Sequence, residues 1–271
     1  MLLERIQLWK EAPIDGDYAP YIEHYIPDDV KTDAAVVLMP GSAYFWSPDI
    51  PKNEGENVAK YLADKGINVF VVIYRVSADC YPHPILDGRR AMRLIRYNAE
   101  KFGIDKNKLI TLGYSAGGHL CASLVSYHEA LEGEGADEAD NESYVPNYQA
   151  LCFPVISFDT EKSYTHCGSV ENLLGEKYAH LAPLMSFEKT ACAPVPPTFL
   201  FHNFDDPAVG VENSLLYAKR LRELGASVEM HIYPDGGHGV GYERDREAAN
   251  EHNKDWLCRF VEWLKYKGLH T

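Results

Sequence analysis

The sequence predicts an α/β fold in which a mostly parallel central sheet carries helices on both faces. Short apolar, β-branched runs alternate along the chain with longer amphipathic stretches, and most of these runs are apolar throughout. A strand covered by helices on both faces is apolar at nearly every position, and strand–helix alternation at this spacing is typical of parallel neighbours. The length of 271 residues suits one large domain or two small ones, and we expect a single domain over residues 1–271.

The expected elements follow one another in regular alternation. Strands are expected at Ala34–Met39, Val69–Tyr74, Leu109–Gly113, Ala150–Phe153, Thr198–His202 and Val228–Tyr233. Helices are expected at Asn53–Lys65, Ile85–Phe102, Ala116–His128, Val211–Leu224 and Arg244–Lys265. The residues up to about Tyr25 are expected to add an antiparallel hairpin at one edge of the sheet.

Two segments interrupt this alternation. Glu132–Asn147 is acidic and contains glycine and proline, so we expect a solvated loop there. Residues 158–197 show no strand pattern and only a short helical piece near Ser169–Leu174. About forty residues between two strands exceed an ordinary connection, so we expect an inserted cap over the ligand cleft.

Charge and composition limit the partners. The net charge is −14, from 26 basic and 40 acidic residues, and such a field repels nucleic acid and anionic membranes. No apolar run approaches the length that crosses a bilayer, and the first ten residues do not have the pattern of a secretory signal. The six cysteines are scattered without a C-x-x-C pair, so we expect reduced thiols in a cytoplasmic protein.

The segment Gly113–Gly117, with the sequence GYSAG, has the G-x-S-x-G pattern of a nucleophile elbow. Five-residue patterns recur by chance, but here a strand run precedes the segment and a helical run follows it, which is the setting that the elbow needs. The glycines leave room around the serine, and the start of the next helix favours negative charge. We therefore predict Ser115 as a nucleophile; the alternative is a glycine-rich turn without chemistry.

Candidates for the base and the acid follow the last two expected strands. His238 lies between glycines after Val228–Tyr233, and its position after the serine and the acid favours it over an ordinary surface histidine. Asp205 and Asp206 both follow Thr198–His202, and either could hold the imidazole in the required tautomer. The other aspartate would cap a turn.

An oxyanion hole requires backbone N–H donors at two positions. One donor is expected at Ala116, the residue after the nucleophile. The second is expected in Pro40–Tyr44, because small residues after the strand Ala34–Met39 let the backbone approach a substrate. The alternative is an ordinary turn at the end of that strand.

With these pieces in order, the chain resembles the esterase and lipase branch of the α/β-hydrolases, especially its small carbohydrate-esterase-like (acetyl xylan esterase-like) members. The resemblance runs from about Ala34 to Lys265. Its segments are Pro40–Tyr44, Tyr74–Ser77, Gly113–Gly118, Pro197–His202, Val211–Ser214 and Tyr233–Gly239.

The resemblance implies the α/β-hydrolase fold and assigns roles to individual positions. The family loop P-G-G-G-Y or H-G-G-G implies Ser42 and Ala43 as oxyanion donors, although both replace glycines. The family spacing D-x-x-V-P implies Asp206 as the acid, through Val209, although Gly210 replaces the proline.

Several other residues near these motifs were weighed for a role. Tyr44, Phe45 and Trp46 follow the expected oxyanion loop and either pack in the core or form an aromatic wall for a sugar ring or acyl chain; Tyr44 and Trp46 are the substrate-binding candidates. His119, one helical turn after the serine, is expected to be a packed helix residue. His166 lies in the expected cap, and no metal site is expected there.

The expected activity is hydrolysis of a small-molecule carboxylic ester with a short acyl group, such as acetyl on a sugar, by Ser115, His238 and Asp206 without a cofactor. An amidase, a peptidase or an aryl formamidase on the same three residues is the alternative enzyme. A non-enzymatic binding protein on this fold is the remaining alternative, although that class usually lacks one of the three residues.

Overall fold

The computed structural model describes residues 2–10, 19–45, 55–134, 137–239 and 252–271. The strands of one sheet are β1 (Leu2–Gln7), β2 (Tyr21–Ile26), β3 (Ala35–Met39), β4 (Asn68–Ile73), β5 (Leu109–Tyr114), β6 (Tyr148–Cys152), β7 (Thr198–Asn203) and β8 (Val228–Tyr233). The α-helices are α1 (Asn57–Asp64), α2 (His83–Tyr97), α3 (Ala99–Phe102), α4 (Ser115–Ser126), α5 (Cys167–Tyr178), α6 (Phe187–Thr190), α7 (Glu212–Glu223) and α8 (Asp255–Tyr266).

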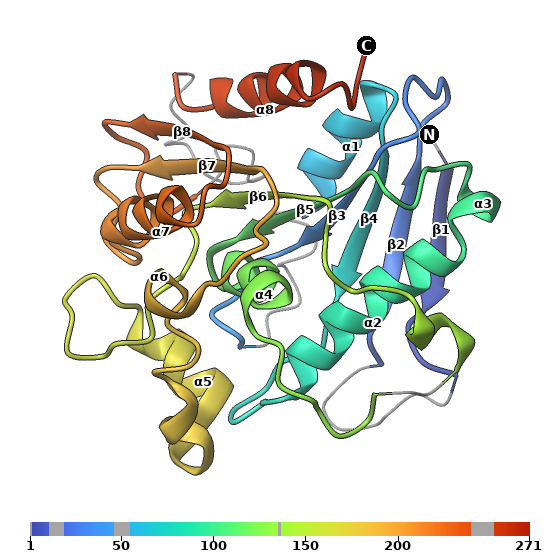
Figure 1. Cartoon of the computed structure of the whole chain (residues 1–271). Helices are drawn as coiled ribbons and strands as arrows, with labels where there is room; N and C mark the ends of the chain where they lie inside the picture. Colours follow the sequence, from blue (N-terminus) through green and yellow to red (C-terminus); the bar gives the residue numbers. More distant parts are fainter. Residues whose placement is uncertain (1, 11–18, 46–54, 135–136, 240–251) are drawn as a thin grey trace.

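The sheet has the order β1-β2-β4-β3-β5-β6-β7-β8, which Figure 1 shows from β8 across to β1. The pairs from β4 across to β8 are all parallel, and β2 joins β4 antiparallel. β1 and β2 form the antiparallel hairpin expected at the edge. Because β3, β5, β7 and β8 are parallel, their carboxyl ends lie at one edge of the sheet, where ligands bind in open α/β folds.

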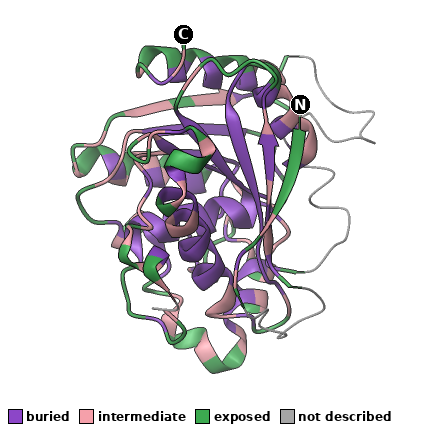
Figure 2. Ribbon diagram, turned by 90° about the vertical axis from the view of Figure 1, so that its right-hand side faces the viewer, coloured by how far each residue is buried: buried purple, intermediate pink, exposed green. Residues whose placement is uncertain are grey.

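Two apolar cores lie on the two faces of the sheet. Val37 and Met39 of β3 pack with residues of α2, α4, α5 and α7, whereas Val36 and Leu38 pack with residues of α1 and α8. Successive side chains of a strand point to opposite faces, so a strand with helices on both sides is apolar at every position. Figure 2 shows the central strands buried and the outer strand near the N-terminus exposed. The predicted fold class is confirmed.

The helix expected over Ile85–Phe102 is divided at Asn98. α2 ends at Tyr97 and α3 begins at Ala99, and the Asn98 side chain donates to the carbonyl of Leu94 at 2.8 Å. An asparagine that bonds the backbone in this way competes with the helical pattern. Part of the helix expected from Arg244 lies outside the described residues, and α8 begins at Asp255.

The acidic segment Glu132–Asn147 was expected to be a solvated loop, and this is wrong for the part that packs on α2. Arg90, which is 3% exposed, binds both carboxylate oxygens of Asp137 at 2.7 Å. Arg89 binds Glu134 at 2.7 Å. The hydrogen bond from Arg90 is the main cause that lowers the pKa of Asp137 to about 2. Buried arginines on a distant helix thus hold this segment.

The segment between β6 and β7 is more helical than expected. It holds α5, a short 3₁₀ helix (Ala179–Leu181) and α6, where the sequence indicated one short helical piece. Asn172 of α5 donates to the carbonyl of Ala43 at 2.9 Å, so the segment reaches the loop after β3. It therefore lies against the carboxyl edge of the sheet.

Candidate active site

The three side chains expected to act together meet at the carboxyl edge of the sheet. Ser115 follows β5 directly, Asp206 follows β7 and His238 follows β8. His238 Nε2 lies 2.9 Å from Ser115 Oγ, and His238 Nδ1 lies 2.8 Å from Asp206 Oδ2. The structure therefore brings together a hydroxyl, an imidazole and a carboxylate in one continuous hydrogen-bonded chain.

Ser115 is the first residue of α4 and has a strained backbone where β5 passes into that helix. Its φ of 50° is in the left-handed region, which an L-residue adopts at a cost. The close approach of β3 explains the glycine at 117, because a Cβ there would overlap the backbone oxygens of Met39 and Pro40. A Cβ at Gly113 would overlap the carbonyl oxygen of Gly117. The motif glycines are thus required by packing around the serine.

The carboxylate of Asp206 is fully enclosed and held at both oxygens. Its side chain is 0% exposed, and Oδ1 accepts from the amides of Ala208 and Val209, each at 2.9 Å. Burial alone would raise the pKa of this carboxyl group, but hydrogen bonds from His202 and His238 outweigh burial and hold the pKa well below its ordinary value. Asp206 is therefore ionised and accepts a hydrogen bond from the N–H at Nδ1 of His238.

Asp205 has a different partner from Asp206. Its Oδ1 accepts from the backbone N–H of Gly237 at 2.9 Å, one residue before His238. The pair of adjacent aspartates thus divides into one that contacts the imidazole and one that contacts the backbone of the same loop. The residues by themselves left these two positions open, and the family resemblance implied Asp206 as the acid.

Two residues that the sequence analysis did not single out support the histidine. Asn203, the last residue of β7, donates to the carbonyl oxygens of Gly237 at 2.9 Å and Gly239 at 3.3 Å. The ring of Phe153 contacts the His238 ring edge-on, with centroids 4.7 Å apart. The sequence offered one indication of their role: both residues lie at the carboxyl ends of β7 and β6, at the edge of the sheet where His238 lies.

The loop after β3 has an unusual backbone. Ser42, Ala43 and Tyr44 have φ values of 146°, 53° and 59°, although none of them is glycine. Their carbonyl oxygens accept from Phe45 N at 2.8 Å, Asn172 Nδ2 at 2.9 Å and Cys80 Sγ at 3.9 Å, respectively. Within the described part of the chain, no group accepts from the amides of Ser42 and Ala43. Two N–H groups are thus available at the edge where Ser115 lies.

Ala116 is the second residue of α4 and lies in its first turn. The amides of a first helical turn have no partner within the helix, so they can serve a ligand. The helix thus supplies a donor next to the serine hydroxyl.

Tyr44 is a core residue and not the exposed wall that the sequence suggested. Its side chain is 0% exposed, and its hydroxyl lies 2.9 Å from His119 Nδ1. The sequence does not reveal this inward position of the ring. Phe45 is 56% exposed. Trp46, the other substrate-binding candidate, lies outside the described residues.

The remaining histidines near the site differ in their roles. His119 is fully buried and stacks on Phe158 with centroids 4.0 Å apart, as expected for a packed helix residue. His202 Nε2 donates to the carbonyl of Val209 at 2.9 Å and supports the loop that holds Asp206.

His166 caps the start of α5 through Nδ1, which accepts from the Ser169 amide at 3.1 Å. Burial is the main cause that lowers the pKa of His166, and the positive charge of protonated His238 lowers it further. The start of α5 therefore lies within electrostatic reach of the site. Among the described residues, no group of His, Cys, Asp and Glu side chains could hold a metal ion.

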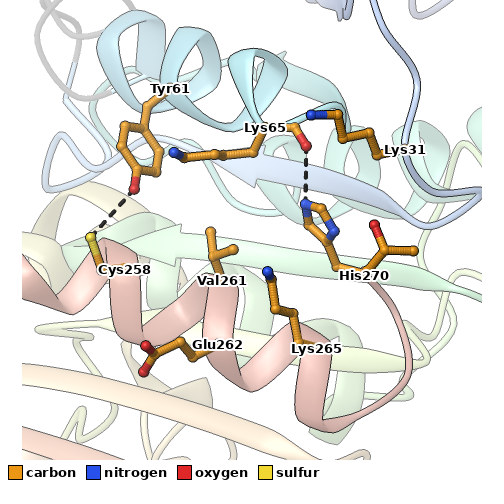
Figure 3. Close-up of a pocket in the computed structure, with 9 residues that line it drawn as sticks. Lys31, Tyr61, Lys65, Cys258, Val261, Glu262, Lys265 and His270 are labelled. Carbon is orange, nitrogen blue, oxygen red and sulfur yellow. Dashed lines mark hydrogen bonds between the residues drawn. The ribbon is translucent and has the colours of Figure 1, made fainter.

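A separate cavity of about 360 Å³ lies between α1 and α8. Tyr61 and Lys65 line it on one side and Cys258 and Lys265 on the other, as Figure 3 shows. None of Ser115, Asp206 and His238 lines it, so it is not the site of the hydrogen-bonded chain. Of the helices that the structure describes, none has both the length and the apolar character that crossing a membrane requires.

Comparison with known proteins bears on the fold and the family. The BD-FAE family pattern matches residues 22–221. The acetyl ester-xyloside bifunctional hydrolase of Caldicellulosiruptor lactoaceticus has a similar structure, with a TM-score of 0.86 and 33% identity over 99% of this chain and 97% of that chain.

Two curated relatives match by sequence. Endo-1,4-beta-xylanase B of Butyrivibrio fibrisolvens is 34% identical over 89% of this chain, and the acetylxylan esterase of Xylanibacter ruminicola is 30% identical over 80%. The chain spans only 38% and 43% of the length of these two relatives. With the fold and the family match together, the protein belongs to the BD-FAE family and has the α/β-hydrolase fold.

Proposed function

We propose that this protein removes short acyl groups, above all acetyl, from the hydroxyls of xylan-type sugars. The single observation that carries the proposal is the chain from Ser115 through His238 to Asp206, with distances of 2.9 Å and 2.8 Å. The names of the similar proteins, an acetylxylan esterase and an acetyl ester-xyloside hydrolase, support acetyl as the acyl group and a xylose-based alcohol.

The proposed reaction proceeds in two halves. Ser115 Oγ attacks the ester carbonyl while His238 Nε2 takes its proton, and Asp206 stabilises the imidazolium through Nδ1. The tetrahedral oxyanion accepts hydrogen bonds from the amides of Ala116 and of Ser42 or Ala43. His238 then gives the proton to the departing sugar oxygen, which leaves as a free hydroxyl. Water attacks the acyl-enzyme while His238 takes its proton, and that proton passes to Ser115 Oγ as the carboxylic acid leaves.

We further propose that residues 158–197 act as a cap over the ester, in contact with both its alcohol and its acyl group. The carbonyl of Tyr164 accepts from Gly210 N at 3.3 Å and from Asn213 Nδ2 at 2.8 Å, so this segment is attached beside the loop that carries Asp206. His166 lies two residues after Tyr164 in the same segment. A polar cap of this kind suits a hydroxyl-rich alcohol.

A fluorophosphonate probe tests the nucleophile, and a substrate panel tests the specificity. The probe should label the wild-type protein at Ser115, identified by peptide mapping, and should not label Ser115→Ala, whose circular dichroism serves as the folding control. Acetylated xylo-oligosaccharides should be better substrates than aryl formamides and peptides. Labelling at another residue would contradict the nucleophile, and a preference for the formamide would replace the esterase proposal by an amidase.

A further inference from the structure

The loop after β3 adopts a conformation that its own residues disfavour. Positive φ values are ordinary for glycine but cost free energy in residues with a Cβ, and Ser42, Ala43 and Tyr44 have them in succession. Such a backbone persists only where the surroundings determine it. The question is therefore which contacts hold these three residues in place.

The strongest contact joins Tyr44 to His119. His119 Nε2 lies 3.0 Å from the carbonyl oxygen of Met185, and a carbonyl can only accept, so Nε2 carries the proton. Nδ1 is then the acceptor, and the Tyr44 hydroxyl donates to it at 2.9 Å. Both side chains are 0% exposed. The Met185 carbonyl thus fixes the tautomer of His119, and the unprotonated Nδ1 holds the loop through the Tyr44 hydroxyl.

The imidazole itself cannot move easily. It lies parallel to Phe158 with centroids 4.0 Å apart, and it also contacts Phe187 at 4.8 Å. Burial lowers the pKa of His119 to about 3, so the ring remains neutral and Nδ1 remains an acceptor at ordinary pH. Asn172 adds a second restraint on the loop through the carbonyl of Ala43.

His119 lies on the same helix as Ser115 and Ala116, one turn further along α4. We infer that His119 and Tyr44 are positioning residues that set the distance between the two halves of the oxyanion hole. One half is the Ala116 amide at the start of α4, and the other is the Ser42–Ala43 backbone, which the Tyr44 hydroxyl ties to α4. The oxyanion role of these amides rests on the proposed function; the tie between the loop and α4 does not.

Tyr44→Phe removes only the hydroxyl and is the principal test. Tyr217→Phe is the matched control, because Tyr217 is also fully buried and its hydroxyl accepts from Gln149 at 3.2 Å, within the same core. We expect Tyr44→Phe to lower kcat on an acetyl ester about 10- to 100-fold, below the roughly 100- to 1000-fold loss of a deleted oxyanion donor. KM should change less than about threefold, since the loop binds the developing charge and not the ground state.

The rate at which a fluorophosphonate labels Ser115 should fall together with kcat. In the labelling reaction, the phosphoryl oxygen of the probe occupies the oxyanion hole. Tyr217→Phe should lose similar stability but retain both rates. Equal rates in the two variants, or a loss confined to KM, would overturn the inference. A wild-type protein that the probe does not label would overturn the inference together with the proposed function. Labelling without ester hydrolysis would overturn only the proposed function, and the labelling rates would still decide the inference.

A second pair of variants replaces the histidine. His119→Gln retains an acceptor and a donor on one side chain, whereas His119→Leu retains neither. We expect His119→Gln to be labelled at least about tenfold faster than His119→Leu. A displaced active-site group can slow a reaction by about 100-fold. Equal rates for two folded variants would show that the hydrogen bonds of His119 do not position the loop.

Discussion

Asp205 and Asp206 hold the same loop by different atoms. Asp205 accepts from the backbone N–H of Gly237 at 2.9 Å, and Asp206 accepts from the ring of His238 at 2.8 Å. Asp206→Asn should lower kcat by about 10³- to 10⁴-fold, because an amide favours the wrong tautomer of the imidazole. Asp205→Asn should cost less than about tenfold, because the amide oxygen of asparagine still accepts from a backbone N–H.

Steady-state kinetics of both variants on one acetyl ester make the comparison. A severe Asp205→Asn and a mild Asp206→Asn would reverse the two roles, and two mild variants would place the acid elsewhere.

The preference for short acyl groups is a second prediction. The proposed cap, residues 158–197, exposes polar residues such as Thr160, Glu161 and Lys162 and, apart from Leu184, offers little large apolar surface to a long acyl chain. An apolar slot would add about 0.8 kcal/mol for each buried methylene. We therefore expect kcat/KM for acetyl and butyryl aryl esters to exceed that for octanoyl esters by about tenfold or more. A rate that rises steadily with chain length would contradict this.

The glycine at 117 should be irreplaceable for steric reasons. A Cβ there meets the backbone oxygens of Met39 and Pro40, which cannot move without shifting β3. Gly117→Ala should lower the free energy of unfolding by about 3 kcal/mol or more, by overpacking. Gly103→Ala is the comparison variant: unlike Gly117, Gly103 has a left-handed φ, of 66°, but nothing lies within 4 Å of the added Cβ. That variant should cost about 1–2 kcal/mol, the conformational penalty alone. Urea unfolding of both variants measures the difference, and equal losses would refute the steric explanation.

The low pKa of His119 makes a prediction about acid stability. The unfolded chain binds a proton at this histidine below pH of about 6.5, whereas the folded protein does not until the pH is near 3. Stability is therefore lost as the pH falls through this window, by about 1.4 kcal/mol per pH unit from this group. His119→Gln lacks this titrating group. Between pH 6 and pH 4, its free energy of unfolding should therefore fall less steeply than that of the wild type, by about 1.4 kcal/mol per pH unit. Parallel stability curves would show that His119 is not buried and neutral.

The strands from β3 to β7 were predictable because burial on both faces leaves a mostly apolar run in the sequence. What the sequence could not give were contacts that depend on distant partners. Asp137 appears solvated until the buried Arg90 is placed beside it. Tyr44 could equally line a wall or pack inside, until the contact of its hydroxyl with His119 Nδ1 places it in the core.

The residues of the candidate site also differ in how far the sequence predicts them. Ser115 and His238 follow from the strand–turn–helix context and from chain order, which are local properties of the sequence. The choice between Asp205 and Asp206 depends on the conformation of one loop, and only the family spacing pointed to Asp206. Asn203 carries no motif, and it became visible only through its bonds to the loop of His238.

The complete burial of α4 has a consequence for how this protein can vary. Every residue from Ser115 to Ser126 is buried, so a change on any side of that helix meets packed neighbours. Random substitutions there should be tolerated rarely, whereas the exposed parts of residues 158–197 should tolerate many. Selection for activity on a new alcohol or acyl group would then act on surface positions that tolerate substitution, while the core around α4 does not tolerate it. Laboratory evolution of this protein should therefore place its mutational libraries in that surface and leave α4 constant.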